Sequence, residues 1–128
     1  MDNERFSFRS RFRSFRFAGQ GIRALARYEH NFRIHICAAL IALCLGFLLN
    51  ISTVEWCLII FAIAMVLGAE ALNTALEVIC DKITTERDPL VGRAKDVSAA
   101  GVLFVAISAL IVGILIFLPK IITWLLHI

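Results

Sequence analysis

Three long runs of apolar residues dominate the sequence, and short polar segments separate them. The runs cover residues 32–50, 55–81 and 97–118. Each is close to or above the roughly 20 residues that a helix needs to cross a hydrocarbon core of about 30 Å. The pattern predicts an all-α integral membrane protein whose three transmembrane helices form a single membrane-embedded domain over residues 1–128.

The segment before the first run interleaves arginine with phenylalanine. On a helix over residues 5–28, Phe8, Phe12 and Phe15 share one face and most of the arginines lie elsewhere. This pattern predicts an amphipathic helix in the membrane surface, with arginines among the headgroups. A nucleic-acid-binding arm can have a similar composition. Because this segment leads straight into a membrane span, we expect no nucleic-acid partner.

The second run ends in polar positions spaced three and four residues apart. They form one stripe on an otherwise apolar helix: Glu70, Asn73, Thr74, Glu77 and Asp81. An acidic residue at a transmembrane helix centre costs about 2.5–3.5 kcal/mol on insertion scales, and it is retained mainly where a function requires it. Acids that are simply solvated at the interface are the alternative, but they would not need Asn73 and Thr74 between them.

Two polar segments follow the second and third runs. Residues 82–96 are charged and contain Pro89 and Gly92, a composition typical of a loop. Residues 121–128 follow Pro119 and are predicted to form an interfacial tail. In the first run, His30 and His35 are predicted to be interfacial residues, since no other ligand is spaced for zinc.

The basic residues are distributed unevenly. Of 13 Lys and Arg, eight fall within residues 1–33, four within 82–95, and only Lys120 lies beyond. The positive-inside rule therefore places the N-terminus and segment 82–96 on the cytoplasmic side of the inner or plasma membrane. The four cysteines lie in or beside apolar runs without a CxxC pair, so packing is favoured over a metal or redox role.

This topology predicts a cluster of acidic and basic side chains at the cytoplasmic interface. Such a cluster suits phosphoryl transfer, because Mg²⁺ typically takes one or two carboxylates plus substrate phosphates, and a further carboxylate can accept the proton of an attacking hydroxyl. The sequence has neither GxxxxGK[ST] nor a kinase glycine-rich loop. From spacing alone, an ion or proton pathway and a structural subunit with a polar packing stripe remain alternatives.

The pattern ExxNTxxE, followed by an aspartate and GRAKD, resembles the small prokaryotic diacylglycerol kinase family, whose members phosphorylate diacylglycerol or undecaprenol. In this chain it consists of Glu70, Asn73, Thr74, Glu77, Asp81 and residues 92–96. The resemblance extends to Glu29, to residues 31–33 and to the three spans. It implies a homotrimer with active sites shared between neighbouring subunits, ATP as co-substrate, Mg²⁺ as cofactor and a membrane lipid as acceptor.

The same resemblance implies roles for individual residues. Glu70 would be the general base, while Glu29 and Glu77 would hold the magnesium ion that bridges the ATP phosphates. Asn73 and Asp81 would support the site. The residues implied to contact the nucleotide are Phe17, near the adenine, and Glu86, Arg87, Asp88, Lys95 and Asp96. Residues 31–35 resemble the undecaprenol branch more closely, so undecaprenol is favoured as acceptor over diacylglycerol.

Overall fold

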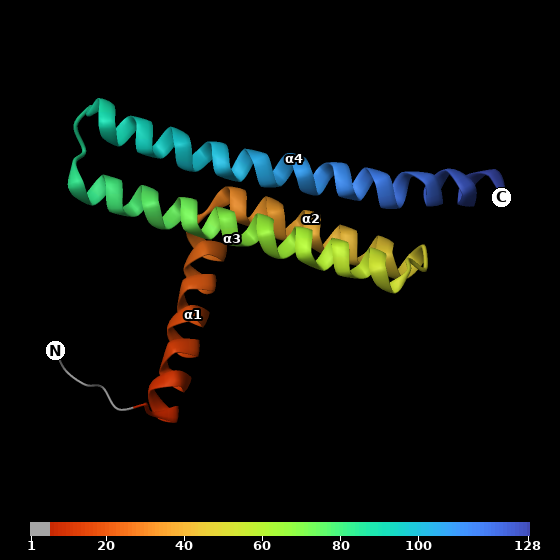
Figure 1. Ribbon diagram of the computed structural model, residues 1–128, viewed down its shortest axis with the longest axis horizontal. Helices are drawn as coiled ribbons and strands as arrows, with labels where there is room; N and C mark the ends of the chain where they lie inside the picture. The colour runs from red at the N-terminus through yellow and green to blue at the C-terminus, as the bar shows by residue number, and fades with distance from the viewer. Residues whose placement is uncertain (1–5) are drawn as a thin grey trace.

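The computed structural model describes residues 6–128, and all regular secondary structure in that range is helical (Figure 1). The helices are α1 (Phe8–Tyr28), α2 (His30–Leu48), α3 (Thr53–Ile83) and α4 (Pro89–Leu126). Helices α2, α3 and α4 are long and apolar enough to cross a membrane. The predicted all-α fold with three potential membrane spans is confirmed.

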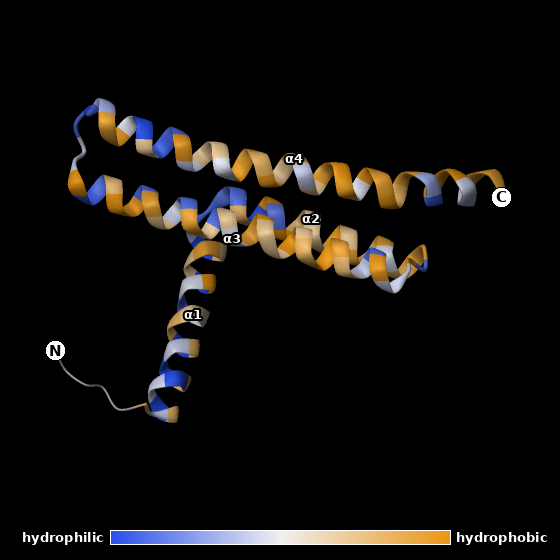
Figure 2. Cartoon of the chain, in the orientation of Figure 1, coloured by the Kyte–Doolittle hydropathy of each residue, from blue (hydrophilic) through white to orange (hydrophobic). Residues whose placement is uncertain are grey.

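Helix α1 runs crosswise to the other three, which lie side by side (Figure 1). It has no buried residue, and Phe8, Phe12 and Phe15 are exposed. A helix that lies in a membrane surface needs this orientation and these exposed apolar side chains. Hydrophilic residues gather on α1, at the start of α2 and where α3 turns into α4, with a few more at the turn between α2 and α3 and near the end of α4, whereas the middle of the bundle is mostly apolar (Figure 2).

Helix α4 begins earlier than the sequence pattern predicts. The Oδ1 atom of Asp88 accepts hydrogen bonds from the backbone N–H groups of Leu90 (2.8 Å) and Val91 (3.1 Å). Pro89 is the first helical residue, where its missing N–H is not needed. The prediction of a loop over residues 82–96 was therefore wrong for most of its length, because Pro89 starts the helix and Gly92 lies inside it.

The end of α4 also differs from the prediction. The helix continues through Pro119 to Leu126, so residues 121–128 are not a separate tail. A proline inside a membrane helix can be tolerated because neighbouring groups satisfy the backbone locally. The Oγ1 of Thr123 donates a hydrogen bond of 2.9 Å to the carbonyl oxygen of Pro119 in this turn.

The turn between α2 and α3 is closely packed and lies beside the hydrophobic core cluster. Ser52 and Glu55 form a reciprocal capping box at the start of α3, with distances of 2.8 and 3.2 Å. A small core cluster lies beside it, formed by Ile51, Ile59, Ile116 and Phe117. Gly46 is buried against the indole of Trp56, so this end of the bundle is held by close packing.

Candidate functional site

Glu70 is the most deeply buried ionisable residue in the described part of the chain. Only 3% of it is exposed, on the side of α3 that faces the bundle. Its Oε2 lies 3.9 Å from Nε2 of His35 on α2. Because a buried carboxylate needs a compensating partner or a functional reason, this position is the centre of the candidate site.

The polar stripe continues along α3 from Glu70. Asn73 is 9% exposed, and its Nδ2 donates a hydrogen bond of 3.3 Å to Oε1 of Glu77. The buried Oδ1 of Asn73 and Oγ1 of Thr74 have no hydrogen-bond partner among the described residues. Leaving such an atom unsatisfied costs about 1–3 kcal/mol. These two atoms therefore mark a place where a further polar group fits.

Glu29 lies at the junction of α1 and α2, half buried. It occupies the N-cap position of α2 without using its side chain as a cap. The charges that act on Glu70 are those of His35, Glu77 and Glu29. Glu77 lies two turns beyond Glu70 on the same helix, whereas Glu29 stands just before the first residue of α2.

The donor chemistry of this group fits a magnesium ion. No cluster of three or more His, Cys, Asp or Glu side chains suited to a metal occurs within residues 6–128. Magnesium needs fewer protein ligands than that, since one or two carboxylates and substrate phosphates complete its shell. Glu29 and Glu77 would supply two carboxylates, and the Oδ1 of Asn73, which has no hydrogen-bond partner within residues 6–128, would add an oxygen near Glu77.

A second cluster joins α3 to α4 one turn beyond Glu77. The Nζ of Lys95 donates a hydrogen bond of 2.6 Å to Oδ1 of Asp81. The short contact holds the amine of Lys95 against the carboxylate of Asp81. Both side chains are accessible to solvent, with 38% of Lys95 and 63% of Asp81 exposed. The pair therefore presents a fixed positive charge that a phosphate group can reach.

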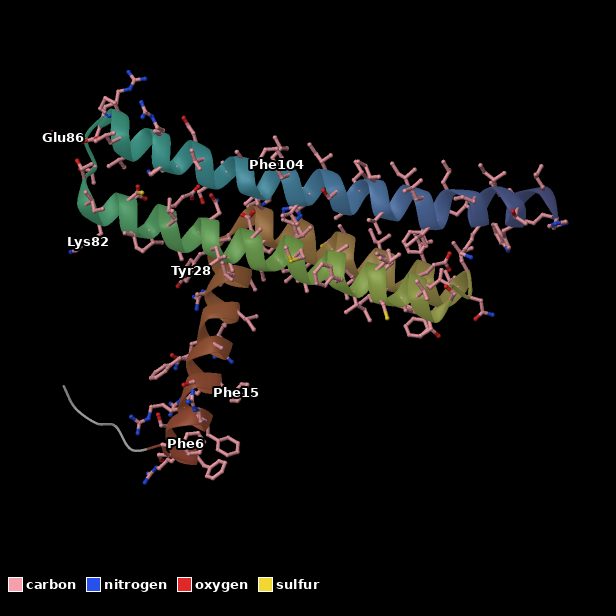
Figure 3. All side chains as sticks on the ribbon, in the orientation of Figure 1. Phe6, Phe15, Tyr28, Lys82, Glu86 and Phe104 are labelled. Atoms are coloured by element: carbon pink, nitrogen blue, oxygen red, sulfur yellow. The ribbon has the colours of Figure 1, made fainter. Side chains whose placement is uncertain are left out.

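The remaining residues predicted to contact nucleotide are spread over the chain. Glu86 and Arg87 lie in the linker between α3 and α4, while the Asp88 carboxylate caps α4. Asp96 is exposed on α4, and Phe17 is 60% exposed on α1. Figure 3 shows Phe15 on α1 far from Glu86, so a single chain does not bring α1 to the linker.

Sequence reasoning missed two features of the site. His35 was not selected as a site residue, yet its Nε2 lies 3.9 Å from Oε2 of Glu70. The sequence carried no signal for this contact, because it depends on the packing of α2, where Phe32, three residues earlier, is buried. The pairing of Asp81 with Lys95 joins residues 14 positions apart across a turn, which spacing rules for a single helix do not cover.

Comparison with known proteins identifies the family. The family model described as prokaryotic diacylglycerol kinase matches residues 16–117. This chain belongs to that family. It is 45% identical over 109 residues to the undecaprenol kinase of Bacillus subtilis, covering 85% of this chain and 89% of the relative.

Diacylglycerol kinases are also among the relatives. That of Haemophilus influenzae is 39% identical over 101 residues, covering 79% of this chain and 83% of the relative. The diacylglycerol kinase of Escherichia coli K12 is 35% identical over 95 residues, covering 74% of this chain and 78% of the relative. The chain is therefore a membrane lipid kinase, which takes a lipid and ATP as substrates. This conclusion favours the enzyme interpretation over an ion pathway or a structural subunit.

Proposed function

We propose that this protein transfers the γ-phosphate of Mg-ATP to the hydroxyl of a membrane lipid alcohol, with undecaprenol as the favoured acceptor and diacylglycerol as the second candidate. The observation that carries the proposal is a buried carboxylate, Glu70, placed between an apolar bundle and a cluster of polar groups. A lipid hydroxyl reaches such a position from the hydrocarbon side, and a nucleotide reaches it from the aqueous side.

Glu70 acts as the general base. Its carboxylate takes the proton of the acceptor hydroxyl while the hydroxyl oxygen forms a bond to the γ-phosphorus. The bond from that phosphorus to the β,γ-bridging oxygen breaks, and ADP leaves with the bonding electrons. A positioned general base contributes about 10²–10⁴-fold to the rate of such a transfer.

The neighbouring residues bind and orient the nucleotide. Glu29 and Glu77 would hold the magnesium ion, which supplies charge neutralisation at the phosphates when bound. Asn73 orients Glu77 through their hydrogen bond of 3.3 Å. Lys95, held by Asp81, supplies a positive charge to the phosphates, and Asp96 lies one residue further along α4. Phe17, Glu86, Arg87 and Asp88 form the outer part of the nucleotide site.

We further propose that three copies of the chain assemble and share their active sites. The separation of Phe15 on α1 from Glu86 in the α3–α4 linker supports this, because these two parts of one chain do not meet and would share a nucleotide only if different copies contribute them (Figure 3). The numerous apolar side chains exposed on α2, α3 and α4 leave ample surface for lipid and for neighbouring subunits.

The proposed orientation places the N-terminus and the α3–α4 linker in the cytoplasm. Twelve of the 13 Lys and Arg residues lie within residues 1–33 and 82–95, which favours this side under the positive-inside rule. ATP is then supplied to the side of the membrane where Lys95 and Asp96 lie. The whole chain forms one membrane-embedded kinase domain.

The experiment that tests the function measures transfer of labelled γ-phosphate from Mg-ATP by the purified protein in detergent micelles. Undecaprenol and diacylglycerol are supplied separately and then in competition. We expect labelled lipid from both acceptors, with more product from undecaprenol at equal mole fraction. Preferred phosphorylation of diacylglycerol would reverse the acceptor assignment, and no labelled lipid from either would contradict the function.

A further inference from the structure

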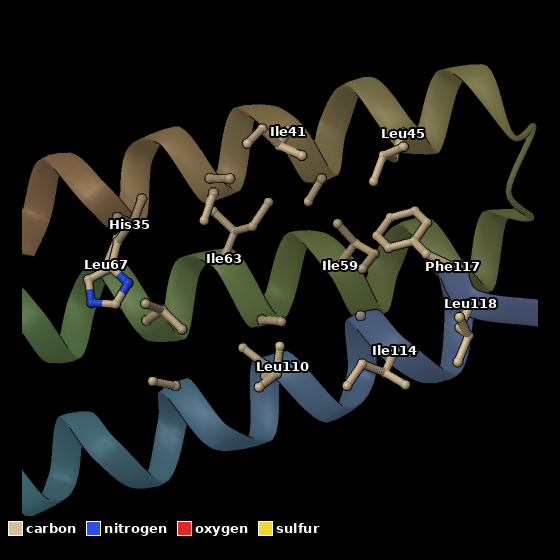
Figure 4. A pocket seen from close by; sticks show the side chains of 18 of the residues that line it. His35, Ile41, Leu45, Ile59, Ile63, Leu67, Leu110, Ile114, Phe117 and Leu118 are labelled. Carbon is tan, nitrogen blue, oxygen red and sulfur yellow. The ribbon is translucent and has the colours of Figure 1, made fainter. Parts of the chain in front are cut away.

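An apolar groove ends beside the candidate base. It runs between α2, α3 and α4 and has a volume of about 600 Å³. Its walls are alanine, glycine, leucine, isoleucine, valine and phenylalanine, apart from one residue, His35. Figure 4 shows His35 and Leu67 at one end of the groove and Leu118 at the other. The imidazole of His35 therefore lines the end of the groove and lies next to Glu70.

The position of His35 is fixed by packing of α2. Phe32, one turn earlier on the same face, is only 4% exposed and holds this part of the helix against the bundle. The His35 side chain itself is 23% exposed, and its Nε2 faces Oε2 of Glu70 at 3.9 Å. Hydrogen bonds to oxygen span about 2.7–3.2 Å. Catalytic contacts in ligand-free enzymes are often longer than this and tighten when the substrate binds.

Among the groups whose charges act on Glu70, His35 has a distinct chemistry. The others are Glu77 and Glu29, which are carboxylates. Only the imidazole can donate a hydrogen bond to Glu70 or carry a positive charge beside it. It does so through Nε2, either in the neutral tautomer that has a proton on this atom or as imidazolium.

We propose that His35 is a positioning residue for Glu70. Its Nε2–H holds Oε2 of the carboxylate, so that Oε1 is oriented toward a hydroxyl at the end of the apolar groove. His35 does not take the substrate proton, which goes to Glu70. This inference rests on the proposed function, because it assigns to His35 the orientation of the base in that reaction.

The kinetic test uses two substitutions of His35. His35→Ala is expected to lower kcat about 10²-fold, the loss expected when a reacting group is misplaced by about 1 Å, and to leave the KM for Mg-ATP unchanged. His35→Gln keeps an N–H donor on a side chain of similar length. Its kcat is expected to be at least tenfold higher than that of His35→Ala. His30→Ala, an exposed histidine on the same helix, is the matched control and keeps the wild-type kcat.

Two kinetic results would overturn the inference. One is a kcat for His35→Ala within twofold of the wild type. The other is an equal loss in the alanine and glutamine variants, which would mean that the imidazole acts only by filling space.

A spectroscopic test leaves His35 in place. In protein with ¹⁵N-labelled histidine in micelles, the Nε2 resonance of His35 is expected to shift in Glu70→Gln and to stay unchanged in Glu55→Gln at the opposite end of α3. An unchanged resonance in Glu70→Gln contradicts the contact, even if the His35 variants do not fold.

Failure of this inference differs from failure of the proposed function. If the wild type phosphorylates lipid and Glu70→Gln does not, the function and the base stand, and the His35 variants decide only the positioning role. If the wild type phosphorylates neither lipid, the function itself fails.

Discussion

The two ends of the helical bundle are built on opposite principles. At the turn between α2 and α3, the polar groups are paired: Ser52 and Glu55 cap each other, and Glu55 also forms an ion pair of 3.3 Å with Lys120. Toward the other end, the buried Glu70 lies 3.9 Å from His35, and two polar atoms of Asn73 and Thr74 have no partner within the described residues. The polar groups beside the α2–α3 turn are therefore paired with one another, whereas those around Glu70 remain available to a substrate.

The largest expected effect is the loss of turnover in Glu70→Gln. The amide cannot accept the hydroxyl proton, so kcat is expected to fall about 10²–10⁴-fold, the contribution of a general base. Thermal stability in micelles is expected to hold or rise, because a neutral amide replaces a buried carboxylate. Parallel kinetics and unfolding curves check both statements. If Glu70→Gln unfolds at a lower temperature than the wild type and keeps its kcat, Glu70 serves stability and not catalysis.

The opposite result is expected for Gly46→Ala. A Cβ at this position would lie 2.6 Å from Cη2 and 2.9 Å from Cζ2 of Trp56, whose ring packs against Phe47 at 4.8 Å. Overpacking of this kind costs about 1–3 kcal/mol. The unfolding temperature should fall while the kcat of the folded enzyme stays unchanged. Gly101→Ala is the control, since nothing lies within 4 Å of its Cβ.

A smaller effect is expected from the two carboxylates assigned to magnesium. Glu77→Gln and Glu29→Gln each remove a charged oxygen ligand, so the Mg²⁺ concentration for half-maximal activity should rise about tenfold, equivalent to about 1.4 kcal/mol. Titration of activity with Mg²⁺ at fixed ATP measures this. If neither variant changes the magnesium dependence, these residues are not the ligands.

The smallest effect is expected for Asp81→Asn. Its ion pair with Lys95 is exposed, and such pairs contribute little to stability, so the unfolding temperature should stay the same. Loss of the carboxylate releases the lysine from its fixed position, so the KM for ATP should rise a few-fold with little change in kcat. A drop in unfolding temperature with unchanged KM would assign the pair to folding instead.

The sequence pattern predicted the bundle well for a physical reason. Long apolar runs have few stable forms in a membrane other than helices, and spacings of three and four place Glu70, Asn73 and Glu77 on one side of α3. The polar stripe on α3 could therefore be predicted from the sequence without knowledge of how the helices pack. The start of α4 was not, because a proline is compatible both with a loop and with the first turn of a helix.

Contacts between helices were beyond the reach of the pattern. The proximity of His35 to Glu70 depends on how α2 packs on α3, and that of Asp81 to Lys95 depends on where α4 begins. A polar residue at the end of an apolar run is equally compatible with the interface and with a buried site. Only the packing of Phe32 separates these two possibilities for His35.

The most direct test of the account is a single-turnover measurement with the wild type and Glu70→Gln at saturating labelled Mg-ATP and undecaprenol. Bound nucleotide and labelled lipid are quantified in the same samples. The account predicts equal nucleotide binding by both proteins and labelling of the lipid about 10²–10⁴-fold more slowly by Glu70→Gln. Labelled lipid formed by Glu70→Gln at the wild-type rate would contradict the assignment of Glu70 as the base.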